Sequence, residues 1–436
     1  IFAPVILAGC ARYAATHVHD GDAYFRLHKY REAVGEYEKA ARMQPDDPHT
    51  IRQLGFAHSQ LGERAEAYTY LEKARALQPA DAGVRVALGR MYLADGKPSA
   101  ASSEANAVLA TAPDNVDALN LLGSAYLASQ QTDKAAAAFR KITVLAPADA
   151  RARDLLGISL LANGKPAEAA AELERALSLD PSFADPLTKL VEIDLAAHNS
   201  AAALARVKKQ IAIAGDSSRL HELLGLVFVA RHDRAAAEAA FLKVIALDPH
   251  YADPYVRLSE LYREWGKNDK ALAAADSALA IDPRNLSARL VKGVVYEQSG
   301  DVASAERMYE DALAVNPRFA DAANNLASLL SEHDVDQTRA LRLAEVAKQA
   351  SPNDPRISDT LGWILYKHGD VARAVSVLKD AAAKLPAEPT VAYHLGVAQA
   401  RAGDSAGARA ALGRAIAQPA PFPERDAARK ALAMLR

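Results

Sequence analysis

Residues 48–81 read PHTIRQLGFAHSQLGERAEAYTYLEKARALQPAD, and this stretch of 34 residues is the unit from which most of the chain is built. Pro79, near the end of this unit, marks a position at which prolines recur along the chain. They are Pro45, Pro79, Pro113, Pro147, Pro181, Pro249, Pro283, Pro317, Pro352, Pro386 and Pro419. The intervals are 34 residues or twice 34, apart from one of 35 and one of 33. A fixed period of this length indicates a solenoid of stacked supersecondary units.

Two more columns keep the same phase. Leucine-glycine pairs such as Leu54-Gly55 recur with the period, and an alanine stands twelve residues after the glycine slot. Glycine costs about 1 kcal/mol within a helix, so we expect a neighbouring backbone to approach closely there. Turn signals such as Leu61-Gly62-Glu63 follow, where glycine in the left-handed conformation can close a first helix. Each repeat is therefore predicted to be a helical hairpin whose second helix ends at the proline step.

The alanine column is filled in every repeat. Its members are Ala33, Ala67, Ala101, Ala135, Ala169, Ala203, Ala237, Ala271, Ala305, Ala340 (one residue late), Ala374 and Ala408. These columns resemble those of the tetratricopeptide repeat family. The resemblance implies an all-α fold, a right-handed superhelical solenoid of about twelve hairpins over residues 14–420, with a C-terminal capping helix at 421–436.

Repeat six, at about residues 184–216, is degenerate. It has Val191 for the glycine, Asp194 for an aromatic residue, Gln210 for a small residue and Gly215 for the proline. Two interpretations remain open: a flexible joint that divides the solenoid, or sequence drift without consequence, which we favour.

The first ten residues lie outside the repeat. Residues 1–9 are apolar and resemble the end of a secretory signal, and Leu7-Ala8-Gly9-Cys10 resembles the lipobox of bacterial lipoproteins. Cys10 is the single cysteine of the chain. The resemblance implies lipidation at Cys10, with residues 10–13 as the lipid-anchored N-terminus. The residue after the cysteine is Ala11 and not aspartate, which in lipoproteins of this kind favours the outer membrane over the inner one. The resemblance therefore implies a protein on the periplasmic face of the outer membrane.

The composition excludes several other functions. The 52 basic and 54 acidic side chains leave a net charge of −2, which argues against a nucleic-acid-binding surface. The longest apolar run is far shorter than a membrane-spanning helix. No catalytic motif, cofactor-binding loop or metal-ligand cluster emerges, so we expect no enzyme activity, no cofactor and no metal.

Binding of one or more protein partners remains as the function. In the family, the first helix of each repeat lines a concave groove. The candidate groove residues are Phe56, Asn120, Ile158, Leu226, Arg263, Trp363, Tyr366 and Tyr393. The aromatic members are the best candidates, because aromatic side chains dominate interface energetics.

These features together favour a non-enzymatic scaffold, lipid-anchored in the bacterial cell envelope. Among lipoproteins of this build, it resembles those that assemble an export or surface-structure apparatus, such as exopolysaccharide export, the associated protein sorting or pilus assembly. Two alternatives remain. The repeats could be the arm of a larger enzyme such as a glycosyltransferase, or a cytoplasmic adaptor.

Overall fold

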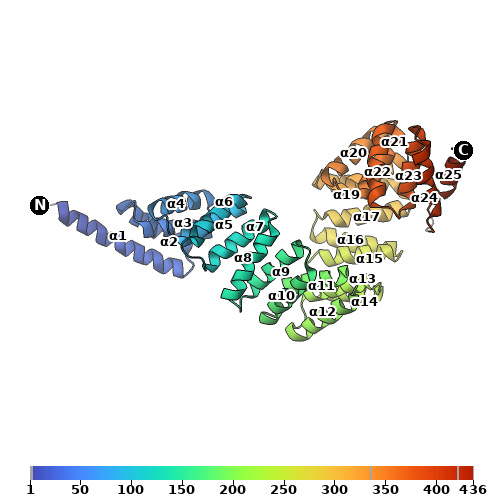
Figure 1. The fold of residues 1–436 in the computed structure, drawn as a ribbon. Coiled ribbons are helices and arrows are strands. Elements are labelled where there is room, and N and C mark those ends of the chain that lie inside the picture. The colour runs from blue at the N-terminus through green and yellow to red at the C-terminus, as the bar shows by residue number, and fades with distance from the viewer. Residues whose placement is uncertain (1–2, 334–335, 420–421, 436) are drawn as a thin grey trace. The chain divides into compact units, whose positions relative to one another are not determined.

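The computed structural model describes residues 3–333, 336–419 and 422–435, and their side chains from residue 13 onward. Within these residues the chain forms 25 α-helices and no strand. Twelve antiparallel hairpins follow one another and a single helix ends the series, which confirms the all-α solenoid with a C-terminal capping helix (Figure 1). The chain divides into two compact units, residues 1–216 and 217–436.

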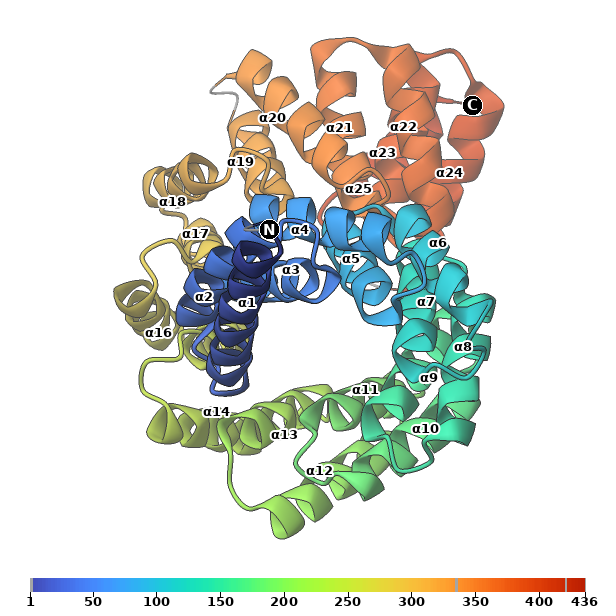
Figure 2. The same ribbon diagram turned by 90° about the vertical axis from the view of Figure 1, so that its left-hand side faces the viewer.

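The first unit holds six hairpins, and each packs on the next in chain order (Figure 2). Their first helices are α1 (Ala3–Arg26), α3 (Pro48–Leu61), α5 (Ala82–Ala94), α7 (Val116–Ala128), α9 (Ala150–Ala162) and α11 (Ala184–Ala196). Their second helices are α2 (Tyr30–Met43), α4 (Arg64–Leu77), α6 (Pro98–Leu109), α8 (Thr132–Leu145), α10 (Pro166–Leu179) and α12 (Ser200–Ala214).

The second unit holds the other six hairpins and the capping helix. Its first helices are α13 (Ser218–Ala230), α15 (Asp253–Glu264), α17 (Leu286–Gln298), α19 (Ala320–Glu332), α21 (Pro355–His368) and α23 (Pro389–Arg401). Its second helices are α14 (Arg234–Leu247), α16 (Asn268–Ile281), α18 (Val302–Val315), α20 (Gln337–Ala350), α22 (Val371–Lys384) and α24 (Ser405–Ala417), followed by α25 (Arg425–Met434).

The first helices end at the glycine turns that the sequence predicted, as α3 illustrates. Asp47 caps α3 by accepting a hydrogen bond from the Thr50 amide at 2.8 Å, and Gly62 closes the same helix with a φ of 75°. In four repeats the residue in this left-handed turn is not glycine but His28, Gln130, His198 or His232, with φ between 55° and 58°. Sequence patterns did not reveal these four, because the turn signal sought was glycine.

The alanine column forms the centre of every hairpin. All twelve of its members, from Ala33 to Ala408, have no exposed surface. A methyl group is the largest side chain that a close helix-helix contact of this kind accommodates. The alanine positions that define the repeat in the sequence are therefore also the positions at the centre of its packed core.

The glycine column faces a side chain first, and in some repeats also the expected backbone: a Cβ atom on Gly55 would lie 3.1 Å from the main-chain nitrogen of Leu71. A Cβ atom on Gly123 would lie 2.7 Å from Cζ of Phe139, which belongs to the second helix of the same hairpin. The residue that occupies this place stands sixteen positions after the glycine and is fully buried. In eight repeats it is a large side chain that covers a glycine: Tyr37, Leu71, Phe139, Leu173, Phe241, Tyr309, Leu378 and Leu412. Glycine is needed because a ring or a branched side chain lies directly on its Cα.

Repeats without glycine in the column compensate by the size of its counterpart. Ser259 and Ala327 stand where the other repeats have glycine, and their counterparts are the alanines Ala275 and Ala344. In repeat six both positions hold valine, Val191 and Val207, and both are buried. A column residue larger than glycine thus goes with a counterpart smaller than the rings and leucines of the other repeats, which avoids overlap in the close-packed interior.

In the third repeat, the space beside the glycine is filled by a side chain of the next repeat. Gly89 has the small Ala105 as its counterpart, and the side chain of Leu121 from α7 of the next repeat closes over the glycine instead. This substitution links two consecutive hairpins through a side chain that is 3% exposed.

Repeat six folds as a regular hairpin in spite of its altered columns. Asp194, in the aromatic slot, pairs with Arg206 at 2.7 Å, and Arg206 also contacts Glu174 at 2.7 Å. Gln210, in a small-residue slot, donates a hydrogen bond to the carbonyl of Pro181. The first compact unit ends directly after this repeat, at Asp216. That the repeat acts as a joint stays a prediction.

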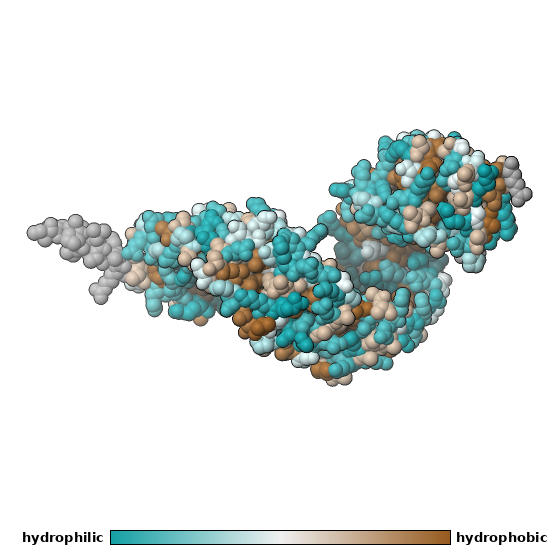
Figure 3. Space-filling view, viewed as in Figure 1, coloured by the Kyte–Doolittle hydropathy of each residue, from teal (hydrophilic) through white to brown (hydrophobic). Residues whose placement is uncertain are grey.

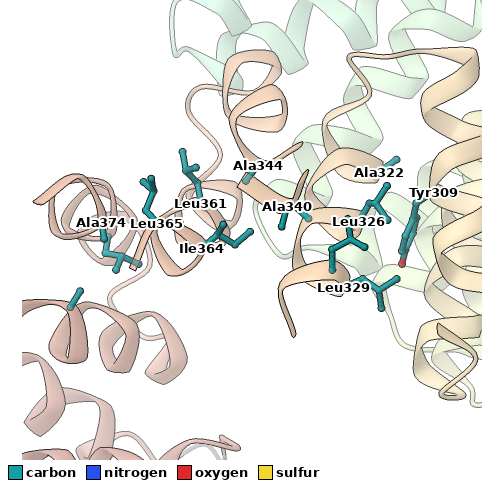
Figure 4. Packing of buried hydrophobic residues seen from close by; sticks show 14 of the residues in the cluster. Tyr309, Ala322, Leu326, Leu329, Ala340, Ala344, Leu361, Ile364, Leu365 and Ala374 are labelled. Atoms are coloured by element: carbon teal, nitrogen blue, oxygen red, sulfur yellow. The ribbon is translucent and has the colours of Figure 1, made fainter. Parts of the chain in front are cut away.

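The core of the second unit runs without interruption through several hairpins. Figure 4 shows Tyr309 beside Leu326 of α19, and Leu361 and Leu365 of α21 further along the same cluster. At the C-terminal end α25 covers the last hairpin, and Ala428 is its buried residue together with Phe422 before the helix. Ala431, Leu432 and Leu435 are partly buried against the same cluster, whereas Ala427 is exposed.

The contact between glycine and its counterpart predicts a specific pattern of stability changes. Gly123→Ala should lower the free energy of unfolding by about 1–3 kcal/mol, because the new methyl group overlaps the ring of Phe139. Gly413→Ala is the matched control, since nothing lies within 4 Å of a Cβ atom there. That change should be neutral or stabilising by up to about 1 kcal/mol. Urea denaturation followed by circular dichroism measures both.

A double-mutant cycle separates this contact from helix propensity. Phe139→Ala alone should cost about 3–5 kcal/mol. In the Gly123→Ala/Phe139→Ala double variant the added methyl group finds space, so the combined loss should be smaller than the sum of the two. Additive losses would show that the two positions do not share one volume.

Candidate partner-binding surfaces

The first helices of the hairpins form a layer of their own. Within the second unit α15 contacts α17, α19 contacts α21 and α21 contacts α23, and within the first unit α5 contacts α7. All eight predicted groove residues lie on such first helices and are half-buried. They have one side packed and one side toward solvent, and contact with a partner remains a prediction.

A cleft of about 640 Å³ opens on this layer in the first unit. Phe25 of α1, Phe56 of α3 and Met91 of α5 supply apolar lining. Its polar lining includes Arg90, which pairs with Asp117 at 2.7 Å. The cleft combines apolar surface with an ion pair, which suits an apolar side chain of a partner. Phe56 was among the predicted residues, whereas Phe25 and Met91 were missed.

A second cleft in the same unit, of about 610 Å³, lies between α9 and α11. Leu161, Ile193 and Lys189 line it, and Lys189 pairs with the buried Asp154 at 3.4 Å. Burial raises the pKa of Asp154, and the ammonium of Lys189 opposes that rise. Lys189 is thus committed to an internal partner.

The second unit carries a cluster of aromatic rings on α21 and α23, which we call the aromatic patch: Trp363, Tyr366, Tyr393 and His394. The ring of Trp363 stacks on His394 with 4.1 Å between centroids and on Tyr366 with 5.1 Å. Tyr393 lies 6.0 Å away at a tilt of 48°. His394 is 8% exposed and its Nδ1 lies 3.0 Å from a carboxylate oxygen of Asp359. This contact holds the imidazole in place, so the stack has a fixed geometry.

The structure brings three of the predicted residues together in this patch and leaves the others apart. Leu226 packs against the core cluster around Phe241, and Arg263 contacts the neighbouring Glu264 at 3.9 Å. Asn120 accepts a long hydrogen bond from Ser124, and Ile158 is a half-buried residue of α9. The side chain of Cys10 lies outside the described residues, although α1 runs through its position.

A half-buried carboxyl group, that of Glu297, lies in the same layer, on α17. Glu297 accepts a hydrogen bond of 2.6 Å from the hydroxyl of Tyr309. Burial raises the pKa of Glu297; the Tyr309 hydrogen bond opposes this, and the charge of Glu332 adds to it. The folded protein therefore holds the proton of this carboxyl more tightly than the unfolded chain does.

This shift predicts a change of stability with pH. The raised pKa of Glu297 means that its contribution is favourable in acid and is lost as the pH rises through the folded pKa. Glu297→Gln should therefore stabilise the protein at neutral pH, with a smaller gain in acid. The exposed Glu264→Gln is the control. Thermal midpoints measured from pH 4 to 8 test this, and an equal gain at every pH would contradict it.

The rest of the described surface offers few other sites. The visible face in Figure 3 is largely hydrophilic, with hydrophobic residues in small patches. None of the described residues forms a cluster of three or more side chains that could hold a metal ion. No helix in the described part of the chain has the length and apolar character needed to cross a bilayer.

The stacked hairpins and the surfaces on their first helices define a helical-repeat protein that binds other proteins. The tetratricopeptide repeat family model matches residues 86–150, 222–285, 256–306, 290–355 and 360–423, and a second model of that description matches residues 160–227. The chain belongs to the tetratricopeptide repeat family. Such proteins are typically non-enzymatic scaffolds for protein-protein interaction.

Known proteins are similar to this chain over different lengths. A TPR repeat-containing protein of Pseudomonas aeruginosa is 36% identical over 77 residues, which cover 18% of this chain and only 13% of that protein. A structure of the APC/C hetero-tetramer Cut9-Hcn1 has a chain with a TM-score of 0.51 and 13% identity, covering 99% of this chain and 97% of that one. Yeast Tom70 gives a TM-score of 0.47 at 17% identity, covering 97% and 96%. The Cut9-Hcn1 likeness shows a shared fold.

Proposed function

We propose that the protein is a scaffold of the bacterial cell envelope. It is tethered by lipid on Cys10 to the periplasmic face of the outer membrane and assembles components of an export or surface-structure apparatus. Exopolysaccharide export, protein sorting and pilus assembly are the candidate systems. The proposed lipid tether is supported by the sequence Leu7-Ala8-Gly9-Cys10 before the first repeat.

The fold is compatible with processing at this place. The described side chains by which α1 packs include the fully buried Ala14 and Asp22, which accepts a 2.7 Å hydrogen bond from Tyr37. Removal of residues 1–9 would leave these contacts intact. A lipid on the thiol and a second acyl chain on the new amine would supply the two hydrophobic signals that stable anchoring needs.

Two separate surfaces support assembly of more than one component. The 640 Å³ cleft around Phe56 lies in the first unit, and the aromatic patch around Trp363 lies in the second. Aromatic side chains bury large areas at a small cost in conformational entropy, so both are suited to anchor a partner. A scaffold with two surfaces can hold two partners at once.

The tether is tested by labelling cells with a clickable fatty acid. The wild-type protein should carry the label and sediment with outer membranes, whereas Cys10→Ser should carry none and leave the membrane fraction. Cys10→Ser lies outside the repeat, so unchanged thermal unfolding controls for folding. An unlabelled wild-type protein found in the cytoplasm would support the adaptor alternative. A mature protein much larger than this chain would support the arm of a larger enzyme.

The binding surfaces are tested by photo-cross-linking in cells. Benzoylphenylalanine in place of Phe56 or Tyr366 should give discrete cross-linked products with envelope proteins. The matched controls replace Val144 on α8 and Leu242 on α14, exposed apolar residues of second helices. These controls should give no such products. Equal products from all four positions would show that the first-helix layer is not the binding surface.

A further inference from the structure

The aromatic patch is bordered by two cations that have no carboxylate partner. Arg401, in the last turn of α23, lies 5.2 Å above the ring of Tyr366 and donates a hydrogen bond of 3.1 Å to its carbonyl. Lys367, in the last turn of α21, donates a hydrogen bond of 2.7 Å to the carbonyl of Ser331. Within the described part of the chain, neither side chain has a carboxylate at ion-pair distance.

Cations that line the two clefts of the first unit are paired with carboxylates. Arg90 is paired with Asp117, and Lys189 with Asp154. Within the patch itself the carboxylate Asp359 is engaged by His394. Burial, and then the charge of Glu424, raise the pKa of Tyr393, so a second carboxylate lies near the patch on its C-terminal side. The border beside Trp363 and Tyr366 presents the two cations Lys367 and Arg401.

The two cations are held in fixed places and remain exposed. Each is bound by one main-chain carbonyl, so each keeps donors available to a ligand. A carboxylate that reaches either cation would meet a positive charge beside an aromatic surface that partly excludes water, where a charge-assisted hydrogen bond is stronger than in bulk solvent.

We propose that the aromatic patch, with Lys367 and Arg401, binds an acidic segment of a partner protein in which a large apolar side chain stands beside carboxylates. The apolar side chain packs against Trp363 and Tyr393, and the carboxylates meet the two cations. This inference rests on the proposed scaffold function and adds the chemistry of one partner. Charge complementarity selects an acidic segment over a basic one.

The chain provides its own reporter for this binding. It has two tryptophans, Trp265 and Trp363, so the Trp265→Phe variant leaves a single fluorophore within the patch. The probe is a short peptide with a central phenylalanine flanked by glutamates. Two matched peptides replace the glutamates by lysines, or the phenylalanine by serine. Titration into the full chain should shift Trp363 emission with the first peptide and not with the other two.

Charge variants then test the two cations directly. Lys367→Gln/Arg401→Gln, in the same background, should weaken binding of the acidic peptide by about tenfold or more and reduce its salt dependence. The control is Lys384→Gln on α22, which breaks a surface pair with Asp380 at 3.0 Å. It should leave binding unchanged. Circular dichroism verifies that each variant is folded.

The outcomes separate this inference from the scaffold function. Binding of the lysine peptide as tight as that of the glutamate peptide, or equal binding by the double variant, would overturn the acidic-segment proposal. Absence of any peptide binding would do the same. Cross-linking from Tyr366 in cells would still stand on its own in each of these cases. If a partner is captured there and the acidic peptide does not bind, the scaffold function survives and the partner's chemistry is different.

Discussion

The contact that the rest of the structure depends on is the one between the glycine slot of a first helix and the side chain sixteen positions later, or seventeen in repeat ten, which has one extra residue. This contact sets how closely the two helices of a hairpin approach. Where a glycine meets Phe139 or Tyr309 the ring lies on the Cα atom, and where alanine replaces glycine, as at Ala327, the counterpart shrinks to Ala344. The fit between the two positions is thus kept while the residue types change from one repeat to the next.

The sequence predicted the columns because they repeat. All twelve alanines of the column are fully buried, and the glycine turns lie where expected. The counterparts of the glycines were not predicted, because Tyr37, Leu71 and Ala105 share a position but neither size nor polarity. The turn at His232 was hidden for a similar reason, since only the backbone reveals its φ of 57°.

The same limit applies to the candidate surfaces. Trp363, Tyr366 and Tyr393 were predicted because large aromatic residues stand out at groove positions, and they do lie together. Their arrangement around His394 could not be predicted, because it depends on the distance between α21 and α23 and on the hydrogen bond to Asp359. A period fixes which face a residue occupies, but contacts between faces depend on how consecutive hairpins pack.

In a repeat protein, different positions of the repeat serve stability and recognition of a partner. The buried columns are needed in every hairpin, so their residues are constrained throughout the chain, whereas exposed first-helix positions are free to differ from one repeat to the next. Arg401 illustrates this freedom: at the equivalent place, repeat eleven has Lys367 and repeat ten has Glu332. Arg401 forms no internal ion pair, although it binds the carbonyl and lies over the ring of Tyr366. Its remaining donors are exposed beside an ordered aromatic stack, which fits the acidic ligand proposed above. The end of the second unit, rather than the regular middle of the repeat array, is therefore the more specific candidate for partner recognition.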